Sequence, residues 1–182
     1  GVMIDLASED YDKNVYETRR VVELAHSRNV SVEAELGTIH TADSTLETIA
    51  SGYTDPEVAR NFVRDTGIDC LAVSIGTAHG IYRYTPKINF DLLEELVRGT
   101  PCPIVVHGGS NTPDEEILKM VKLGIAKLNV GTDFFIAYNE ALKDFFAEHG
   151  THCEVVEAMA AARAAIEKVA LEKLRLLNAY RI

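Results

Sequence analysis

The chain has 182 residues, of which 47% are hydrophobic, and a formal net charge of -10 at pH 7. That length suits one domain with a buried core and is short for two, and the acidic surplus argues against nucleic acid as a partner, because phosphate backbones bind basic surfaces. No stretch is apolar over the ~18 uncharged residues of a membrane span, and the start of the chain lacks the basic and apolar segments of a secretory signal, so we expect a soluble protein that is neither secreted nor membrane-bound.

The first predicted strand covers 2–5 and ends in an acidic residue, Asp5. Because the chain opens with Gly1 and is at once in a strand, we expect sequence to be missing before it. Further β-rich apolar runs alternate with amphipathic stretches, which is typical of βα units and a parallel sheet. The other predicted strands cover 30–36, 69–75, 103–107 and 125–130.

Helices are predicted between these strands. In the first, at about 10–27, apolar residues recur at roughly the spacing of one buried helical face. The capping-box patterns TDPE at 54–57 and TPDE at 112–115 predict two further helix starts, and Gly67 and Gly124 predict the ends of those helices. The remaining predicted helices cover 90–98, 133–148 and 154–176, and the last is expected to serve in packing or in contact with a partner subunit.

The number of strands leaves the architecture open. Five parallel strands form either an open doubly wound sheet or part of a (β/α)₈ barrel, which needs eight. Periodicity alone does not choose between them.

Polar residues stand at the carboxyl ends of the predicted strands, where both architectures place their active sites. Asp5, Glu35 and His107 end three of the strands, His79 lies four residues beyond another, and Asn129 lies near the end of the last. The sequence therefore predicts a functional site at this edge of the sheet.

Each of these residues also has a structural interpretation. Asp5 is equally explained as the cap of the following helix. Strand alternation puts Glu33 and Glu35 on one face, where they are either a structural pair or, since a buried charge needs a partner, a metal or base site. A single histidine is more often structural than a ligand, but His79 and His107, each followed by glycine, together indicate a metal site.

Zinc is the metal that this set of side chains favours, because it prefers neutral imidazole nitrogen. A catalytic zinc normally takes three protein ligands, and the chain offers His79 and His107 with the carboxylates Asp5 and Glu35 as candidates. His40 is a reserve candidate. The other three histidines are interpreted as surface residues: His26, His149 and His152.

Glycine-rich segments after the last two predicted strands suggest an anion site. In HGGS the backbone of Gly108 and Gly109 can approach a ligand closely, and Ser110 adds a hydroxyl. Gly131 and Thr132 lie where the next helix would point its free N–H groups outward. Two adjacent strand ends that form one phosphate site are typical of a (β/α)₈ barrel, so this pattern favours the barrel.

The cysteines bear on the compartment. Cys70, Cys102 and Cys153 are odd in number, widely spaced and without a C-x-x-C pair. Cys70 and Cys102 lie in apolar runs, as buried reduced thiols do, and reduced thiols favour the cytoplasm.

With these stretches in order, the sequence resembles the class II, metal-dependent ketose-bisphosphate aldolases, and within them most closely the tagatose-bisphosphate branch. The motifs that carry the resemblance run from Val2 to Ile182: VMID, SVEAELG, YTDPEVARNFV, LAVSIGTAHGIY, TPKINFD, VVHGGS, LGIAKLNVGTD and the closing RI. Such a series is far more specific than any single motif.

The resemblance implies a (β/α)₈ barrel in which the chain supplies strands four to eight and the C-terminal helices, as a single domain over 1–182. Strands one to three, with an Asp-His pair that supplies an acid/base and a third zinc-binding histidine, would precede Gly1. His79 and His107 would be the other two zinc ligands. Asp5 and Glu35 would be the carboxylates near an alternative metal position.

The resemblance also implies substrate contacts at Gly80, Gly108, Ser110, Asn129 and Thr132. A monovalent cation, Na⁺ or K⁺, near the phosphate is a further family feature. At Gly131 relatives carry a different residue.

One departure from the family pattern concerns proton transfer. After ELG, relatives have a Gly-Gly-x-Glu-Asp loop with an acidic proton-transfer residue, whereas this chain reads TIHTADS, in which Asp43 is the nearest substitute.

The activity that the resemblance implies is reversible aldol cleavage of fructose or tagatose 1,6-bisphosphate to dihydroxyacetone phosphate and glyceraldehyde 3-phosphate, in a homo-oligomer. Two alternatives stay open at the level of sequence. The chain could be a catalytically incomplete fragment, or a non-catalytic module that binds a sugar phosphate.

Overall fold

The computed structural model describes residues 1–82 and 85–177, and these fall into two compact units, 1–129 and 130–182. The closing RI motif at 181–182 lies outside the described residues. The division leaves the single-domain prediction untested, because one domain can contain more than one compact unit.

The first unit is built on one parallel sheet. Its strands lie in the order β1-β2-β3-β4-β5, so each strand is hydrogen bonded to the next along the chain. Their bounds are β1 Val2–Ile4, β2 Val32–Leu36, β3 Cys70–Val73, β4 Ile104–Val106 and β5 Lys127–Leu128. All five predicted strands are confirmed, each with a shorter range. A doubly wound sheet reverses its strand order, whereas this sheet never does, as the wall of a barrel requires.

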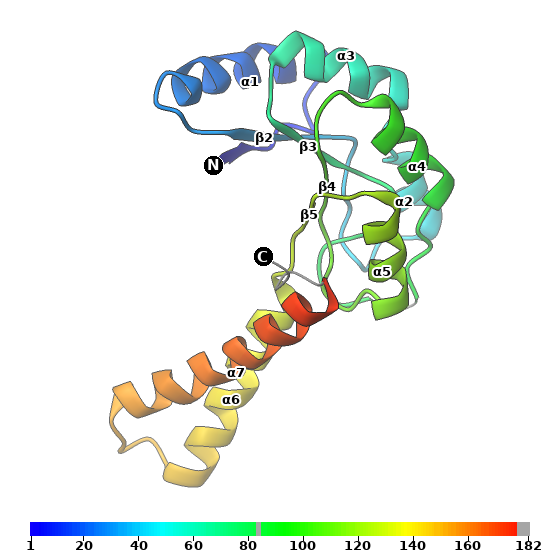
Figure 1. The fold of residues 1–182 in the computed structure, drawn as a ribbon. Coiled ribbons are helices and arrows are strands. Elements are labelled where there is room, and N and C mark those ends of the chain that lie inside the picture. Colours follow the sequence, from blue (N-terminus) through cyan, green and yellow to red (C-terminus); the bar gives the residue numbers. More distant parts are fainter. Residues whose placement is uncertain (83–84, 178–182) are drawn as a thin grey trace. The chain divides into compact units, whose positions relative to one another are not determined.

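Helices cover one face of this sheet (Figure 1). They are α1 Tyr11–His26, α3 Pro56–Thr66, α4 Phe90–Gly99 and α5 Asp114–Leu123. Neighbouring helices pack in the pairs α1 with α3, α3 with α4, and α4 with α5. The largest fully buried side chains include Phe62 of α3, Leu71 of β3 and Ile104 of β4, so the main hydrophobic core lies between sheet and helices.

The two predicted helix starts are confirmed, since α3 begins at Pro56 and α5 at Asp114, but neither helix has the expected capping box. At α3 the N-cap is Asp55, whereas the hydroxyl of Thr54 bonds to Leu36 O and Ser74 N. At α5 the N-cap Pro113 has no side-chain cap bond, and Thr112 donates to Gly108 O at 3.0 Å instead. Both threonines therefore hold the loops at the carboxyl ends of the strands.

Replacing Asp55 with alanine should destabilise the protein by about 1 kcal/mol, because the carboxylate accepts from the N–H groups of Glu57 and Val58 at 2.8 and 2.9 Å. Chemical denaturation measures the change in the free energy of unfolding. Asp55→Asn, which keeps an acceptor oxygen, is the control and should lose much less. Equal losses in the two variants would contradict the capping role.

One helix was not predicted. The helix α2 covers Leu46–Ser51, with Thr45 as its N-cap and Ile49 as its buried residue. Ile49 packs with Ala42 and Ala78 in a small apolar cluster, against which Tyr53 and Tyr82 also pack. The loop after β2 is therefore an ordered part of the first unit.

The second unit is a helical hairpin of α6 Thr132–His149 and α7 Val155–Leu176. The two helices pack on each other, with Lys173 Nζ 3.4 Å from Asp133 Oδ2 and Tyr138 Oη 3.4 Å from Met159 Sδ. Large apolar side chains stay exposed on the hairpin, among them Phe135, Val155 and Val156. Of the helices in residues 1–82 and 85–177, none is long and apolar enough to cross a membrane.

Candidate active site

Strand register gathers polar side chains on the sheet face opposite the helices. Glu35 of β2 pairs with Ala72 of β3, which pairs with Val105 of β4, which pairs with Lys127 of β5. Because side chains alternate along a strand, Glu33 and His107 project from this same face. Several polar groups from strands far apart in sequence therefore meet there.

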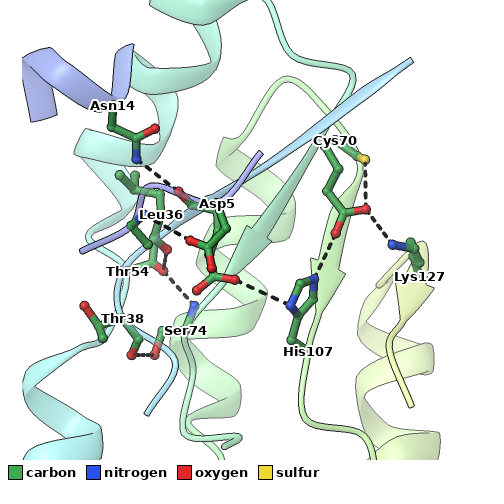
Figure 2. A network of polar contacts seen from close by, with 12 residues as sticks. Asp5, Asn14, Leu36, Thr38, Thr54, Cys70, Ser74, His107 and Lys127 are labelled. Atoms are coloured by element: carbon green, nitrogen blue, oxygen red, sulfur yellow. Dashed lines mark hydrogen bonds and ion pairs between the residues drawn. The ribbon is translucent and has the colours of Figure 1, made fainter. Parts of the chain in front are cut away.

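His107 lies between two buried carboxylates (Figure 2). Its Nε2 is 2.9 Å from Glu33 Oε1, and its Nδ1 is 3.4 Å from Glu35 Oε2. Glu33 also accepts a bond from Lys127 Nζ at 2.6 Å and a long contact from Cys70 Sγ at 3.8 Å. The side chains of His107, Glu33 and Glu35 are each no more than 7% exposed, so they depend on one another for polar contacts.

The two carboxylates have opposite electrostatic environments. Burial alone would raise the pKa of Glu33, but the hydrogen bonds from His107 and Lys127 outweigh it and lower the pKa below the ordinary value of 4.5. Burial, followed by the negative charge of Asp5, raises the pKa of Glu35 to about 7. Glu33 is therefore an ionised acceptor at neutral pH, whereas the pKa of Glu35 lies close to neutral pH.

Glu35 also has an unsatisfied atom. Its Oε2 is buried and makes no hydrogen bond, because the 3.4 Å approach to His107 Nδ1 is an ion-pair distance without hydrogen-bond geometry. A buried carboxylate oxygen without a donor is costly. It is the kind of atom that a bound cation would satisfy.

His79 stands beside His107. The two ring centroids are 5.9 Å apart, with 37° between the ring planes. Partial burial of the His79 ring, and then the charge of His107, lowers its pKa, although the residue as a whole is exposed. A histidine with a lowered pKa is neutral at pH 7, and the neutral ring is the form that binds metals.

Backbone hydrogen bonds fix the position of His79. The segment 40–42 runs parallel to it, with a bridge between Thr41 and His79. His79 N donates to His40 O at 2.9 Å, and Ala42 N donates to His79 O at 2.8 Å. His40, the reserve ligand candidate, thus contributes its carbonyl to the position of His79.

Tyr82 joins the two histidine loops. Its hydroxyl accepts from Ala78 N at 2.6 Å and donates to Gly108 O at 3.3 Å. Ala78 precedes His79, and Gly108 follows His107. One phenol therefore connects the backbones on which both imidazoles stand.

The glycines after His107 are required by close packing. Gly108 has φ +74°, and a Cβ there would lie 2.4 Å from Ala78 O. A Cβ on Gly109 would lie 2.7 Å from the Leu128 side chain, and Gly109 N donates to Asn129 O at 2.9 Å. The Gly109 amide is therefore engaged within the chain.

The remaining candidates are placed as follows. Asp5 is exposed and accepts from Ala7 N at 3.1 Å, and the helix α1 is capped by Asp10 and not by Asp5. Asp43 is exposed in the loop beside His79 and accepts from Thr41 Oγ1 at 2.5 Å.

The predicted phosphate contacts fall in both units. Gly80 has φ +111°, and Ser110 is buried. Asn129 N donates to Val106 O at 2.9 Å. Gly131 and Thr132 belong to the second unit, and their roles stay predictions.

The side chains near His107 are of types that bind metal ions. Two imidazoles, one of them with a lowered pKa, lie near a buried carboxylate oxygen that lacks a donor. Within residues 1–82 and 85–177, no group of three or more His, Cys, Asp or Glu side chains is arranged to hold an ion. Among the described residues, His79 and His107 are therefore candidate ligands, and Glu35 Oε2 lies 3.4 Å from His107 Nδ1.

Sequence reasoning paired Glu33 only with Glu35 and did not predict its contacts with His107 and Lys127. It gave no role to Lys127 or Tyr82. The signal for Glu33 and Lys127 was present in the alternation of β2 and β5, since both project from the polar face.

The strand order of this parallel sheet never reverses, and polar side chains gather at the carboxyl ends of its strands. These two features are typical of barrel proteins, whose active sites lie at that edge. Residues 1–181 match the family described as Fructose-bisphosphate aldolase class-II. The chain belongs to this family.

Two curated relatives are similar over nearly the whole chain. The D-tagatose-1,6-bisphosphate aldolase subunit GatY of Klebsiella oxytoca is 42% identical over 171 residues, which are 93% of this chain and 60% of that protein. The probable fructose-bisphosphate aldolase of Bacillus subtilis (strain 168) is 39% identical over 177 residues, 96% of this chain and 61% of that protein. The chain thus spans about three fifths of the length of these relatives.

Solved structures confirm the barrel class. The YdjI aldolase from Escherichia coli K12 superimposes with a TM-score of 0.80 at 33% identity, over 96% of this chain and 60% of that one. A putative fructose-1,6-biphosphate aldolase from Coccidioides immitis gives 0.75 at 25% identity, over 97% and 62%. The five strands correspond to part of the barrel in these aldolases.

Proposed function

We propose that the protein is a metal-dependent aldolase that reversibly cleaves fructose or tagatose 1,6-bisphosphate to dihydroxyacetone phosphate and glyceraldehyde 3-phosphate. The observation that carries the proposal is the pair of imidazoles, His79 and His107, with ring centroids 5.9 Å apart and His107 between two buried carboxylates, in a chain of this family. The family match favours an aldolase over a self-contained binding module.

Zinc is the proposed cofactor, with His79 and His107 as its ligands in this chain and Asp5 and Glu35 near a second metal position. When bound, zinc supplies a sink for the electrons left when a carbon–carbon bond next to a carbonyl breaks. A cytoplasmic location agrees with Cys70, Cys102 and Cys153, all of which are free thiols.

Proton transfer is assigned to carboxylates of the first unit. Glu35, with a pKa raised to about 7 by burial and by Asp5, can hold or release a proton at neutral pH. Asp43 stands in the loop that runs beside His79 and is the second proposed proton-transfer residue.

Phosphate binding is proposed for residues of the first unit that follow β3, β4 and β5, together with a monovalent cation, Na⁺ or K⁺. The proposed contacts are Gly80, Gly108, Ser110 and Asn129, whereas the amide of Gly109 already donates to Asn129 O. Gly131 and Thr132 of the second unit stay expectations from the sequence. The nearly equal identities to a tagatose-bisphosphate and a fructose-bisphosphate relative, 42% and 39%, support both sugars as substrates. The exposed apolar side chains of the α6–α7 hairpin support a homo-oligomer.

Zinc titration of the metal-free protein tests the proposal. We expect a zinc affinity that falls at least tenfold in His107→Ala, because a ligand is lost, and that stays unchanged in His152→Ala, which removes an exposed histidine of the second unit. Isothermal titration calorimetry gives the dissociation constants. Equal affinities in the wild type and His107→Ala, or aldol cleavage that persists in excess chelator, would contradict the metal role.

A further inference from the structure

Lys127 and His107 both contact the carboxylate of Glu33, so the three residues form a continuous line of contacts from three strands. Figure 2 labels the two ends of this line, Lys127 and His107. Lys127 begins β5, Glu33 lies in β2, and His107 directly follows β4. Lys127 is 94 residues from Glu33 along the chain, and Glu33 is 74 residues from His107. The function proposed above gives Lys127 no role, and it uses Glu33 only as one of the two buried carboxylates beside His107.

The two oxygens of Glu33 have different partners. Oε2 accepts from Lys127 Nζ at 2.6 Å and from Cys70 Sγ at 3.8 Å, while Oε1 lies 2.9 Å from His107 Nε2. An ammonium group can only donate, so it fixes which oxygen of the carboxylate turns away from the histidine. The other oxygen is then presented to the imidazole as an acceptor.

This arrangement decides which nitrogen of His107 carries the proton. A carboxylate oxygen at 2.9 Å from Nε2 requires a hydrogen on Nε2, so in the neutral ring Nδ1 has a free lone pair. Nδ1 lies on the side of Glu35 Oε2, 3.4 Å away. Metal-binding histidines commonly donate their other ring N–H to a carboxylate, which sets the tautomer and the orientation of the ring.

We propose that Lys127 is a positioning residue, which acts through Glu33 to hold His107 in the form that carries hydrogen on Nε2 and turns Nδ1 toward the metal site. The inference rests on the proposed function, since it takes Nδ1 of His107 as the ligand atom. Lys127 itself contacts neither metal nor substrate.

The exposure of the three side chains separates this role from that of a simple ion pair. The Lys127 side chain is 49% exposed, whereas those of Glu33 and His107 are 7% exposed, so only the outer end of the line reaches solvent. Loss of Lys127 would remove one charge partner from the buried carboxylate of Glu33 and leave His107 as the other. The proposed effect of Lys127 falls on the orientation of this buried carboxylate and ring.

The experiment compares Lys127→Met with Lys127→Arg in the full chain. Methionine keeps the aliphatic stem and removes the donor, whereas arginine restores a donor to Glu33. Lys13→Met is the matched control, because it breaks a Lys–Glu contact of 2.8 Å that is exposed and remote from the site. Circular dichroism and denaturation verify that each variant is folded.

Two readouts are needed. Long-range ¹H–¹⁵N NMR of the metal-free protein identifies the protonated nitrogen of His107, and we expect Nε2–H alone in the wild type, Lys13→Met and Lys127→Arg, but a mixture of both forms in Lys127→Met. Calorimetric zinc titration should give an affinity about tenfold lower in Lys127→Met and near that of the wild type in the other two variants.

The outcomes separate the two proposals. An unchanged tautomer or an unchanged zinc affinity in folded Lys127→Met, with zinc binding still dependent on His107, would overturn the positioning role alone. Zinc affinity that is the same in the wild type and in His107→Ala would overturn the proposed function. In that case the NMR measurement still decides whether Lys127 sets the tautomer of His107.

Discussion

Glu35→Gln should make the metal-free protein more stable than the wild type by about 3 kcal/mol above pH 8, with no difference near pH 4. The pKa of Glu35 in the folded protein is raised from 4.5 to about 7, because the side chain is buried and Asp5 lies nearby. Below pH 4 the carboxyl is protonated in both states and contributes nothing. Between pH 4.5 and 7 the unfolded chain ionises first, so stability falls as the pH rises, and above 7 the loss is complete.

Urea denaturation at a series of pH values measures this difference. Glutamine cannot ionise, so the variant should lack the component of pH dependence that Glu35 supplies. Glu157→Gln, which alters an exposed carboxylate of α7, should follow the wild type throughout. The measurement requires a chelator, since a cation beside Glu35 favours its ionised form. If the free energy of unfolding varied with pH in the same way for the wild type and Glu35→Gln, the pKa of Glu35 would not be raised in the folded protein.

Thr54→Val should destabilise the protein by about 2–4 kcal/mol, although the two side chains have nearly the same shape. The Thr54 hydroxyl donates to Leu36 O at 2.5 Å and accepts from Ser74 N at 2.8 Å, and so joins the ends of β2 and β3 (Figure 2). Thr54 is only 2% exposed, so valine would leave both backbone groups without a partner and shielded from water.

Thr54→Ser is the control for this substitution, because it removes the methyl group and keeps the hydroxyl. Its loss should come from the buried methyl alone, about 1 kcal/mol, and stay well below that of valine. The free energy of unfolding from denaturant titration compares the three proteins. A serine variant as unstable as the valine variant would assign the effect to packing.

The sequence was sufficient to locate the strands and most helices, because their signals are local. The run that became β3, Cys70–Val73, is short, apolar and rich in β-formers, and α3 ends where Gly67 adopts φ +73°. The helix α2 was not predicted, because its sequence carries no strong local signal. Six residues with only Ile49 buried give no periodic pattern.

Thr54 and Thr112 show where local patterns mislead. Each precedes a helix in a sequence typical of a capping box, yet each uses its hydroxyl to tie down a loop at the carboxyl end of a strand. A hydroxyl bonds to whichever unsatisfied backbone group the fold brings near, and that depends on tertiary structure. Sequence spacing alone does not contain this information.

In the candidate site too, some features follow from sequence rules and others depend on tertiary structure. The strands of a parallel sheet end at one edge, and this rule predicted that His79 and His107 lie close together. In the structure their ring centroids are 5.9 Å apart. Their metal role stays a prediction. The partners of Glu33 depend on the register of β2 against strands 37 to 94 residues away, which no local pattern encodes.

The hydroxyl of Tyr82, joined to Ala78 N and Gly108 O, has a consequence for ligand capture. These bonds fix the spacing of the two backbones as the chain folds, so, if the imidazoles bind an ion as proposed, little loop freedom would remain to be lost. The affinity of such a preorganised pair would then depend on the removal of water from ion and rings more than on the ordering of loops.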